Sequence, residues 1–194
     1  MSLTSIPRSP QRARRDSERR RLIAWRTAMP QDARETAEQA IVQAIADLLE
    51  PVAARVLALY WPIQGEPDLR PLASRLRDRG WTIALPKVIG RNQPLQFGRW
   101  DAAHALSSGG FGVMLPDPFE PVVPDLLIIP CVGFSEQRFR LGYGGGYYDR
   151  TLAACPAMTL GVAFEGAALD DFEPEPHDRR LDCILTEGRI LGAL

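Results

Sequence analysis

The amino-acid sequence predicts an α/β protein: a single domain with a largely parallel open sheet flanked by helices, in three layers as in Rossmann-like folds. Short apolar segments alternate with segments of helical periodicity along most of the chain, a pattern typical of parallel β-α-β units. A nearly continuous apolar run, residues 125–134, is typical of a central strand covered on both faces. The 194 residues, 45% of them hydrophobic, suffice for one complete core.

The chain is expected to begin with a disordered leader, residues 1–13, and to continue as one domain over residues 14–194. The leader carries Ser, Pro, Arg and Gln without periodicity. Helices are predicted over residues 14–26, 33–49, 69–79 and from Tyr147 to Ala154, and Gly80 ends the third of them. Strands are predicted at residues 56–60, 82–85, 95–97, 125–134, 158–164 and 183–185. Residues 109–119 read as a long loop, either lining a ligand site or merely connecting two elements.

The overall composition excludes several classes of protein. A formal net charge of −1 argues against a protein that coats nucleic acid, and neither a long apolar run nor a signal peptide is found. We therefore expect a cytoplasmic monomer whose partners are small molecules rather than a membrane or a nucleic acid. Cys131, Cys155 and Cys183 lack the spacing of a zinc site or a disulfide framework, and Cys131 and Cys183 are expected in the core rather than as nucleophiles.

Residues 140–150 read Arg-Leu-Gly-Tyr-Gly-Gly-Gly-Tyr-Tyr-Asp-Arg and form the most informative segment of the chain. Glycines allow backbone amides to converge on an anion, an arginine adds charge, and the aspartate can hold a divalent metal ion against the same phosphates. The segment follows the central strand and precedes a helix, so the positive N-terminus of that helix would face a phosphate. This predicts a nucleotide site, and the alternative is a glycine-rich surface turn.

Two common phosphate-binding signatures are absent from the sequence. No G-x-x-x-x-G-K-[ST] motif occurs, and Tyr147 stands where a dinucleotide fingerprint beginning at Gly142 would need its third glycine. A Walker-type NTPase and an ordinary NAD enzyme are therefore both disfavoured.

The segment from Pro130 to Asp149 resembles the signature of the 5-formyltetrahydrofolate cyclo-ligase family, also called methenyltetrahydrofolate synthetases. Weaker matches follow the same order along the chain. They are the basic N-terminal helix, residues 61–68 and 85–87, Phe111-Gly-Val-Met-Leu-Pro116, and Pro176-His-Asp178 followed by Thr186-Glu187. The resemblance implies a ligase that uses ATP and Mg²⁺ to convert 5-formyltetrahydrofolate to 5,10-methenyltetrahydrofolate, releasing ADP and phosphate after phosphorylation of the formyl oxygen.

The resemblance also implies roles for particular residues on the nucleotide side. Arg140 would pair with phosphate, and Asp149, with Asp178 as a second candidate, would ligate Mg²⁺. Arg140, Tyr148 and Asp149 would form the catalytic group. The nucleotide loop would comprise Arg140, Leu141, Gly142, Tyr143, Gly144, Gly145, Gly146, Tyr147 and Tyr148. Arg15 and Arg19 match family residues that reach the ATP phosphates, and their i, i+4 spacing puts them on one helical face; the alternative is a solvated basic face.

The same resemblance implies a folate pocket beside the nucleotide. Trp61 and Phe111 would cover the rings, and Glu66 would accept hydrogen bonds from the pterin. Arg19, Tyr143, Gly144, Gly145, Gly146 and Tyr147 would contact the formyl-folate as well, because the transferred phosphoryl group must lie between the two substrates.

Four positions depart from the pattern of the family. They are Leu69, Ser135, Phe139 and Ala167, which stand where threonine, aspartate, glycine and glutamine are usual. A non-catalytic nucleotide- or folate-binding homologue is therefore the alternative function, and a nucleic-acid contact by the arginine-rich leader is a third.

Overall fold

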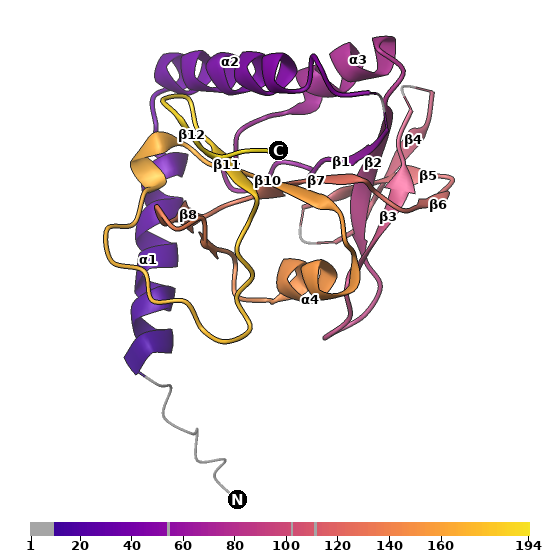
Figure 1. Ribbon diagram of the computed structural model, residues 1–194. Coiled ribbons are helices and arrows are strands. Elements are labelled where there is room, and N and C mark those ends of the chain that lie inside the picture. The colour runs from indigo at the N-terminus through magenta and orange to yellow at the C-terminus, as the bar shows by residue number, and fades with distance from the viewer. Residues whose placement is uncertain (1–9, 54, 102, 111) are drawn as a thin grey trace, which may run out of the picture.

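The computed structural model describes residues 10–53, 55–101, 103–110 and 112–194 (Figure 1). Its centre is an open sheet of eight strands in the order β12-β11-β10-β7-β1-β2-β3-β6. The inner strands are parallel: β11 (Cys183–Leu185), β10 (Met158–Val162), β7 (Leu126–Pro130), β1 (Val56–Ala58) and β2 (Thr82–Val88). The margins are antiparallel: β12 (Ile190–Gly192), β3 (Leu95–Arg99) and β6 (Pro121–Val122). The expected largely parallel open sheet is confirmed.

Helices cover both faces of this sheet. Figure 1 shows α2 (Gln31–Leu48) and α3 (Arg70–Asp78) above the sheet and α4 (Tyr147–Ala154) below it. Ile41 and Leu72 are fully buried in the upper core, and Leu127 and Phe134 lie in the lower core. Each helix turns its apolar residues toward the sheet, because burying them is the main favourable term in folding. The predicted three-layer, single-domain architecture is confirmed.

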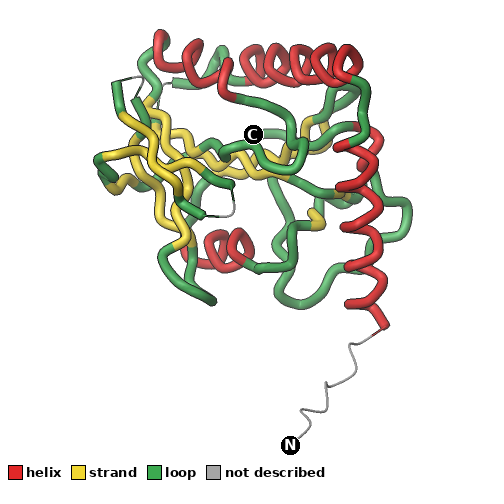
Figure 2. The backbone as a smooth tube through the Cα atoms, turned by 180° about the vertical axis from the view of Figure 1, so that it is seen from behind, coloured by secondary structure: helices red, strands yellow, loops and turns green. Residues whose placement is uncertain are grey.

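The first helix, α1 (Pro10–Thr27), stands apart from these layers. Figures 1 and 2 show it running along one side of the molecule, next to the β8 hairpin and the long segment that precedes β11. Leu22 is completely buried in the lower core and anchors the helix. The helix begins at Pro10, so residues 10–13 are its first turn and do not belong to the predicted leader; residues 1–9 lie outside the described chain. Residues 10–13 read Pro-Gln-Arg-Ala and lack an apolar pattern, which hid the first turn of the helix from sequence reasoning.

The predicted central strand, residues 125–134, is interrupted. It comprises β7, which is buried throughout, and β8 (Gly133–Phe134), which leaves the main sheet and pairs with β9 (Arg140–Leu141). Arg138, at φ 67°, makes the reverse turn between β8 and β9. An apolar run by itself does not reveal where a strand changes its partner, so this break was missed.

The predicted loop of residues 109–119 contains a strand. β5 (Met114–Asp117) pairs with β4 (Ala105–Ser108) in a separate hairpin, with Leu106 opposite Pro116. Proline is a strong signal for a turn, and Pro116 and Pro118 concealed the strand from sequence reasoning. Phe111, one of the predicted folate-binding residues, lies outside the described chain.

Candidate functional site

The glycine segment lies where the sequence predicts it, beyond the carboxyl ends of β7 and β10 and directly before α4. Gly144 and Gly146 have φ values of 87° and 67°, a left-handed conformation that is strained for any residue with a Cβ. Gly146 precedes the first turn of α4. Unpaired amides of a helix N-terminus therefore lie next to a loop made of glycines, which is an arrangement suited to binding an anion.

Arg140 and Asp149 form the central ion pair of this loop. Nη2 of Arg140 lies 2.8 Å from Oδ1 of Asp149, and the arginine side chain is only 4% exposed. Nε and Nη1 of Arg140 are buried and make no hydrogen bond within the described residues. The ring of Tyr148 lies 5.8 Å from the guanidinium, and burial raises the pKa of its hydroxyl, which therefore stays protonated. A buried donor without an acceptor costs about 1–3 kcal/mol, so this arginine is prepared for an anionic ligand.

Arg19 reaches the same loop from α1. Its Nε donates a hydrogen bond of 2.7 Å to the carbonyl of Gly142, and its Nη1 contacts Asp16 at 2.6 Å. A Cβ added at Gly144 would lie 3.3 Å from the guanidinium carbon of Arg19. The helix and the glycine loop are thus in direct contact.

Arg15, one turn earlier on the same face, binds a different segment. Its Nη2 lies 2.5 Å from Oδ2 of Asp178 and donates to the carbonyl of Glu173 at 2.7 Å, while the Phe172 ring lies under the guanidinium. Burial by itself would raise the pKa of Asp178, but the hydrogen bonds from Arg15 and from the amide of Glu175 hold that pKa below its usual value. The interpretation of Arg15 and Arg19 as a solvated basic face is therefore wrong, since both guanidinium groups are engaged.

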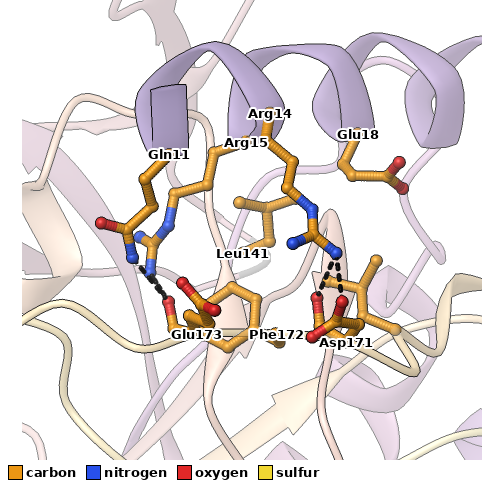
Figure 3. Close-up of a pocket in the computed structure, with 9 residues that line it drawn as sticks. Gln11, Arg14, Arg15, Glu18, Leu141, Asp171, Phe172 and Glu173 are labelled. Carbon is orange, nitrogen blue, oxygen red and sulfur yellow. Dashed lines mark hydrogen bonds and ion pairs between the residues drawn. The ribbon is translucent and has the colours of Figure 1, made fainter. Parts of the chain in front are cut away.

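A small cavity lies where α1 meets this segment. Figure 3 shows Arg14 and Arg15 descending from the helix onto Asp171 and Glu173, with Leu141 behind them. Its volume is about 30 Å³, room for little more than a water molecule. Because Leu141 directly precedes Gly142, this cavity adjoins the glycine loop.

The two predicted metal ligands, Asp149 and Asp178, are each paired with an arginine. The described residues contain no group of three or more metal-ligating side chains. Within that same part of the chain Oδ2 of Asp149 accepts no hydrogen bond and remains available to a cation. Mg²⁺ is commonly held by one or two carboxylates together with substrate phosphates and water, so Asp149 fits a metal ion that arrives with a nucleotide.

Glu66 lies in a buried polar cluster with Tyr143. The Tyr143 hydroxyl donates to Oε1 of Glu66 at 2.7 Å, and the amide of Ile63 donates to Oε2 at 2.9 Å. Burial raises the pKa of Glu66 from 4.5 to about 6, although these hydrogen bonds and the nearby Arg26 oppose the increase. The structure thus brings together Glu66, predicted for the folate, and Tyr143, predicted for the loop.

Sequence reasoning missed Arg26, which belongs to the same cluster. Its side chain is 3% exposed, it hydrogen-bonds to the Tyr143 hydroxyl, and its Nη2 lies 3.9 Å from Oε1 of Glu66. Arg26 follows the buried Leu22 by four residues, so both occupy the buried face of α1. An arginine at an apolar position of a helix was the signal available in the sequence.

Trp61 and Tyr147 are half-buried, unlike the buried Glu66 and Arg26. Trp61 packs edge-on against Trp100, with ring centroids 6.1 Å apart, and Arg70 lies over its ring. Tyr147 stacks under the guanidinium of Arg150, which donates to the carbonyl of Gly145 at 2.9 Å. Trp100 and Arg150 were not singled out from the sequence, and each touches a residue that was.

The cysteines take the positions expected of core residues. Cys131 and Cys183 are buried and unpaired, and burial raises the pKa of Cys131 to about 12. Such a thiol stays protonated at neutral pH and is a poor nucleophile.

This fold and this site define a class of protein: an open α/β enzyme fold with a glycine loop and a buried arginine at the carboxyl edge of its parallel strands. The sequence profile of the 5-formyltetrahydrofolate cyclo-ligase family matches residues 11–187. The chain belongs to this family of carbon–nitrogen cyclo-ligases, as the glycine segment predicted.

Individual relatives agree with the family match. The chain is 30% identical to a 5-formyltetrahydrofolate cyclo-ligase of Mycolicibacterium smegmatis, over 89% of this chain and 93% of that protein. It is 32% identical to the one of Haemophilus influenzae, over 87% and 94%. Two solved 5,10-methenyltetrahydrofolate synthetases share the fold: that of Aquifex aeolicus has a TM-score of 0.81 with 28% identity, covering 91% of each chain. That of Mycoplasma pneumoniae has a TM-score of 0.76 with 25% identity, covering 89% of this chain and 98% of that one.

The described helices include none that is both long and apolar enough to span a bilayer. Monomeric state, cytoplasmic location and the absence of a nucleic-acid partner stay predictions from the sequence.

Proposed function

We propose that this protein converts 5-formyltetrahydrofolate and ATP, with Mg²⁺, to 5,10-methenyltetrahydrofolate, ADP and phosphate. The single observation that supports this best is Arg140, which is buried next to the glycine loop with two donors unpaired and Asp149 beside it. A triphosphate supplies the acceptors that these donors lack, and the amides before α4 add further donors.

The phosphate side of the site would be held from two directions. Residues 142–146 of the glycine loop would provide backbone amides on one side of the phosphates. Arg19, which already donates to the carbonyl of Gly142, would add its charge from α1 on the other side. Asp149 and Asp178 are the proposed ligands of Mg²⁺, and the ion would neutralise phosphate charge during transfer. In the described structure Arg15 is paired with Asp178. For Arg15 to reach the phosphates, or for Asp178 to bind Mg²⁺, this ion pair would have to open or accept the new ligand as a further partner.

The chemistry proposed requires no nucleophilic side chain. The γ-phosphoryl group moves to the formyl oxygen, which turns a poor leaving group into phosphate. The neighbouring nitrogen N10 of the folate then attacks the formyl carbon, loses its proton, and expels phosphate as the five-membered ring closes. Positioning of two substrates and stabilisation of phosphate charge are the tasks that remain for the protein. The buried, protonated thiol of Cys131 is consistent with a reaction that needs no nucleophilic side chain.

The formyl-folate is proposed to lie between the glycine loop and the turn after β1. Glu66 and Tyr143 are joined there by a hydrogen bond of 2.7 Å, so groups proposed for the two substrates lie in one cluster. Trp61, Tyr147 and Phe111 are the proposed aromatic contacts of the folate. Tyr148 keeps its proton and is proposed to donate a hydrogen bond during transfer.

The departures from the family pattern leave the loop supported. Ser135 and Phe139 pair through a backbone hydrogen bond of 2.9 Å, and the Ser135 hydroxyl accepts the Phe139 amide at 3.3 Å. Leu69 is fully buried at the N-cap position of α3, and Asp68 next to it accepts the amide of Arg70, the first residue of the helix, at 2.9 Å. None of these three changes favours loss of turnover.

The test is a turnover assay with purified protein, 5-formyltetrahydrofolate, ATP and Mg²⁺. We expect methenyltetrahydrofolate, followed by its near-ultraviolet absorbance, and one ADP released per product. Saturable ATP or folate binding without ADP release would instead identify the non-catalytic homologue. Binding of neither ligand would refute both functions.

A further inference from the structure

We propose that Arg26 is a positioning residue, which fixes Glu66 and Tyr143 relative to each other and so aligns the two substrate-binding segments. The inference rests on the function proposed above and adds a residue to it. Arg26 is not expected to touch either substrate; it would act through the two side chains that do.

Arg26 holds together three parts of the chain that are distant in sequence. Its Nε donates to the carbonyl of Gln64 at 2.9 Å, in the turn after β1, and its Nη1 donates to the carbonyl of Cys131 at 3.4 Å, just beyond β7. Its Nη2 donates to the Tyr143 hydroxyl in the glycine loop. All three nitrogens of the guanidinium group are therefore used, each toward a different segment.

The planar geometry of the guanidinium group is what permits this. Arginine presents its donors in a rigid fork, whereas lysine offers one flexible charged group that cannot span acceptors on three segments. Arg26 is 2% exposed, and a buried charge persists only when it is well paired. Its pairing is thus specific, and a shorter or apolar side chain would leave Gln64, Cys131 and Tyr143 without their shared donor.

The turn at Gln64 and Gly65, to which Arg26 donates, has a strained backbone conformation that these hydrogen bonds stabilise. Gln64 and Gly65 have φ values of 47° and 74°, and the first of these is strained for a residue with a side chain. Arg34 supports the same turn from α2, through a hydrogen bond of 2.8 Å to the Gly65 carbonyl, and also binds the carbonyl of Arg26. Among the described residues Arg34 makes no hydrogen bond or ion pair with Glu66 or Tyr143, which makes it a matched control.

Charge also connects Arg26 to Glu66. The groups that face this carboxylate are the amide of Ile63 and the phenols of Tyr60 and Tyr148, the Tyr143 hydroxyl, the Cys131 thiol, and the guanidinium of Arg26. Arg26 supplies the positive charge among them. Burial raises the pKa of Glu66 and Arg26 lowers it, so removal of Arg26 should leave more of the carboxyl protonated near neutral pH.

The test compares Arg26→Met, Arg26→Lys and the control Arg34→Met in two measurements. The first follows the Glu66 carboxyl by ¹³C NMR during a pH titration of the ligand-free protein, so it does not depend on activity. We expect its midpoint to rise by about one pH unit in Arg26→Met, to stay near its original value in Arg26→Lys, and to be unchanged in Arg34→Met. An unchanged midpoint in folded Arg26→Met, or an equal rise in Arg34→Met, would overturn the proposal.

The second measurement is steady-state kinetics. We expect kcat/KM for formyl-folate to fall about 100-fold in Arg26→Met, with only partial recovery in Arg26→Lys because lysine restores the charge and not the three-way geometry. Full recovery by lysine would contradict the positioning role. If the unmodified protein turns over no formyl-folate, the proposed function fails, while the NMR titration still decides the link between Arg26 and Glu66.

Arg26→Met could unfold the protein, because it removes several buried hydrogen bonds at once. Tyr143→Phe then carries the test, since it leaves Arg26 in place and deletes only the hydroxyl between Arg26 and Glu66. The Glu66 midpoint should rise and kcat should fall; a variant with both values unchanged would refute the proposed linkage.

Discussion

Arg15 and Asp178 form a two-point ion pair across 163 residues of sequence, with Nη2–Oδ2 and Nη1–Oδ1 distances of 2.5 and 3.3 Å. Their side chains are 10% and 8% exposed. The pair joins α1 to the segment that precedes β11. It also joins a residue predicted for phosphate to one predicted for metal, so these two assignments are physically coupled.

Asp178→Asn should therefore destabilise the protein by roughly 1–3 kcal/mol, because it leaves the buried Arg15 with weaker acceptors. Asp171→Asn is the matched control: Asp171 pairs with Arg14 in the same neighbourhood, but the side chains are 70% and 54% exposed. An exposed pair of this kind is screened by solvent and contributes little to stability, so its loss should be much smaller. Urea unfolding of both variants checks this, and equal losses would contradict it. Because the pKa of Asp178 is lowered, its contribution should be present at neutral pH and disappear as the pH falls through that lowered pKa.

Asp149→Asn should abolish Mg²⁺-dependent turnover and should also destabilise the protein by roughly 1–3 kcal/mol, because it removes the charged partner of the buried Arg140. The amide retains an acceptor oxygen for Nη2 of Arg140 but removes the negative charge that would bind the metal ion. Turnover at several Mg²⁺ concentrations, together with a thermal unfolding curve, checks both parts. Activity equal to that of the unmodified protein would refute the metal assignment.

Arg140→Lys should raise KM for ATP and lower kcat, by roughly 100-fold in kcat/KM, because lysine cannot reproduce the forked donors of a buried arginine. Arg21→Lys provides the comparison, since Arg21 is a residue of α1 whose side chain is 57% exposed. Initial rates over a range of ATP concentrations distinguish the two variants. Similar kinetics for both would remove Arg140 from the phosphate site.

Gly144→Ala should destabilise the ligand-free protein by about 1–2 kcal/mol, since alanine is strained at a left-handed φ of 87°. The new methyl group would also press on Arg19, whose guanidinium carbon lies 3.3 Å from that position. Gly142→Ala is the control, because a Cβ there meets no atom within 4 Å and the backbone φ is not left-handed. Differential scanning calorimetry without ligands should show a loss for Gly144→Ala alone; equal melting temperatures would show that the loop relaxes freely.

Glu66 should make stability depend on pH in the slightly acidic range. Its folded pKa, about 6, lies above the ordinary value of 4.5, so its favourable contribution is complete below pH 4.5 and is lost as the pH rises through about 6. Relative to Glu66→Gln, the unmodified protein should lose about 2 kcal/mol in total from well below pH 4.5 to well above pH 6. Urea unfolding of both proteins at several pH values measures this difference, and a difference that is constant with pH would contradict the raised pKa.

Local patterns in the sequence were enough to predict most elements. The predicted α4 and β11 have the bounds found in the structure, Tyr147–Ala154 and Cys183–Leu185. Both are short segments whose type follows from apolar pattern and glycine placement; β11 is a strand of the main sheet, and α4 packs against β3. The β4–β5 hairpin was missed because Pro116 lies in it, opposite Leu106, and only strand pairing makes that segment extended.

The sequence by itself determined the parallel α/β architecture, the family, and the position of the glycine segment at the end of the central strand. Each of these depends on residues that are neighbours along the chain, where periodicity and turn chemistry act. The tertiary structure decided which charged groups meet: Arg15 with Asp178, Arg19 with the Gly142 carbonyl, and Arg26 with Glu66 and Tyr143. These contacts depend on how α1 packs beside the β8 hairpin and the segment that precedes β11 (Figure 1). Burial acts only after the chain has folded, so a helix that carries many arginines does not reveal which of them will be paired.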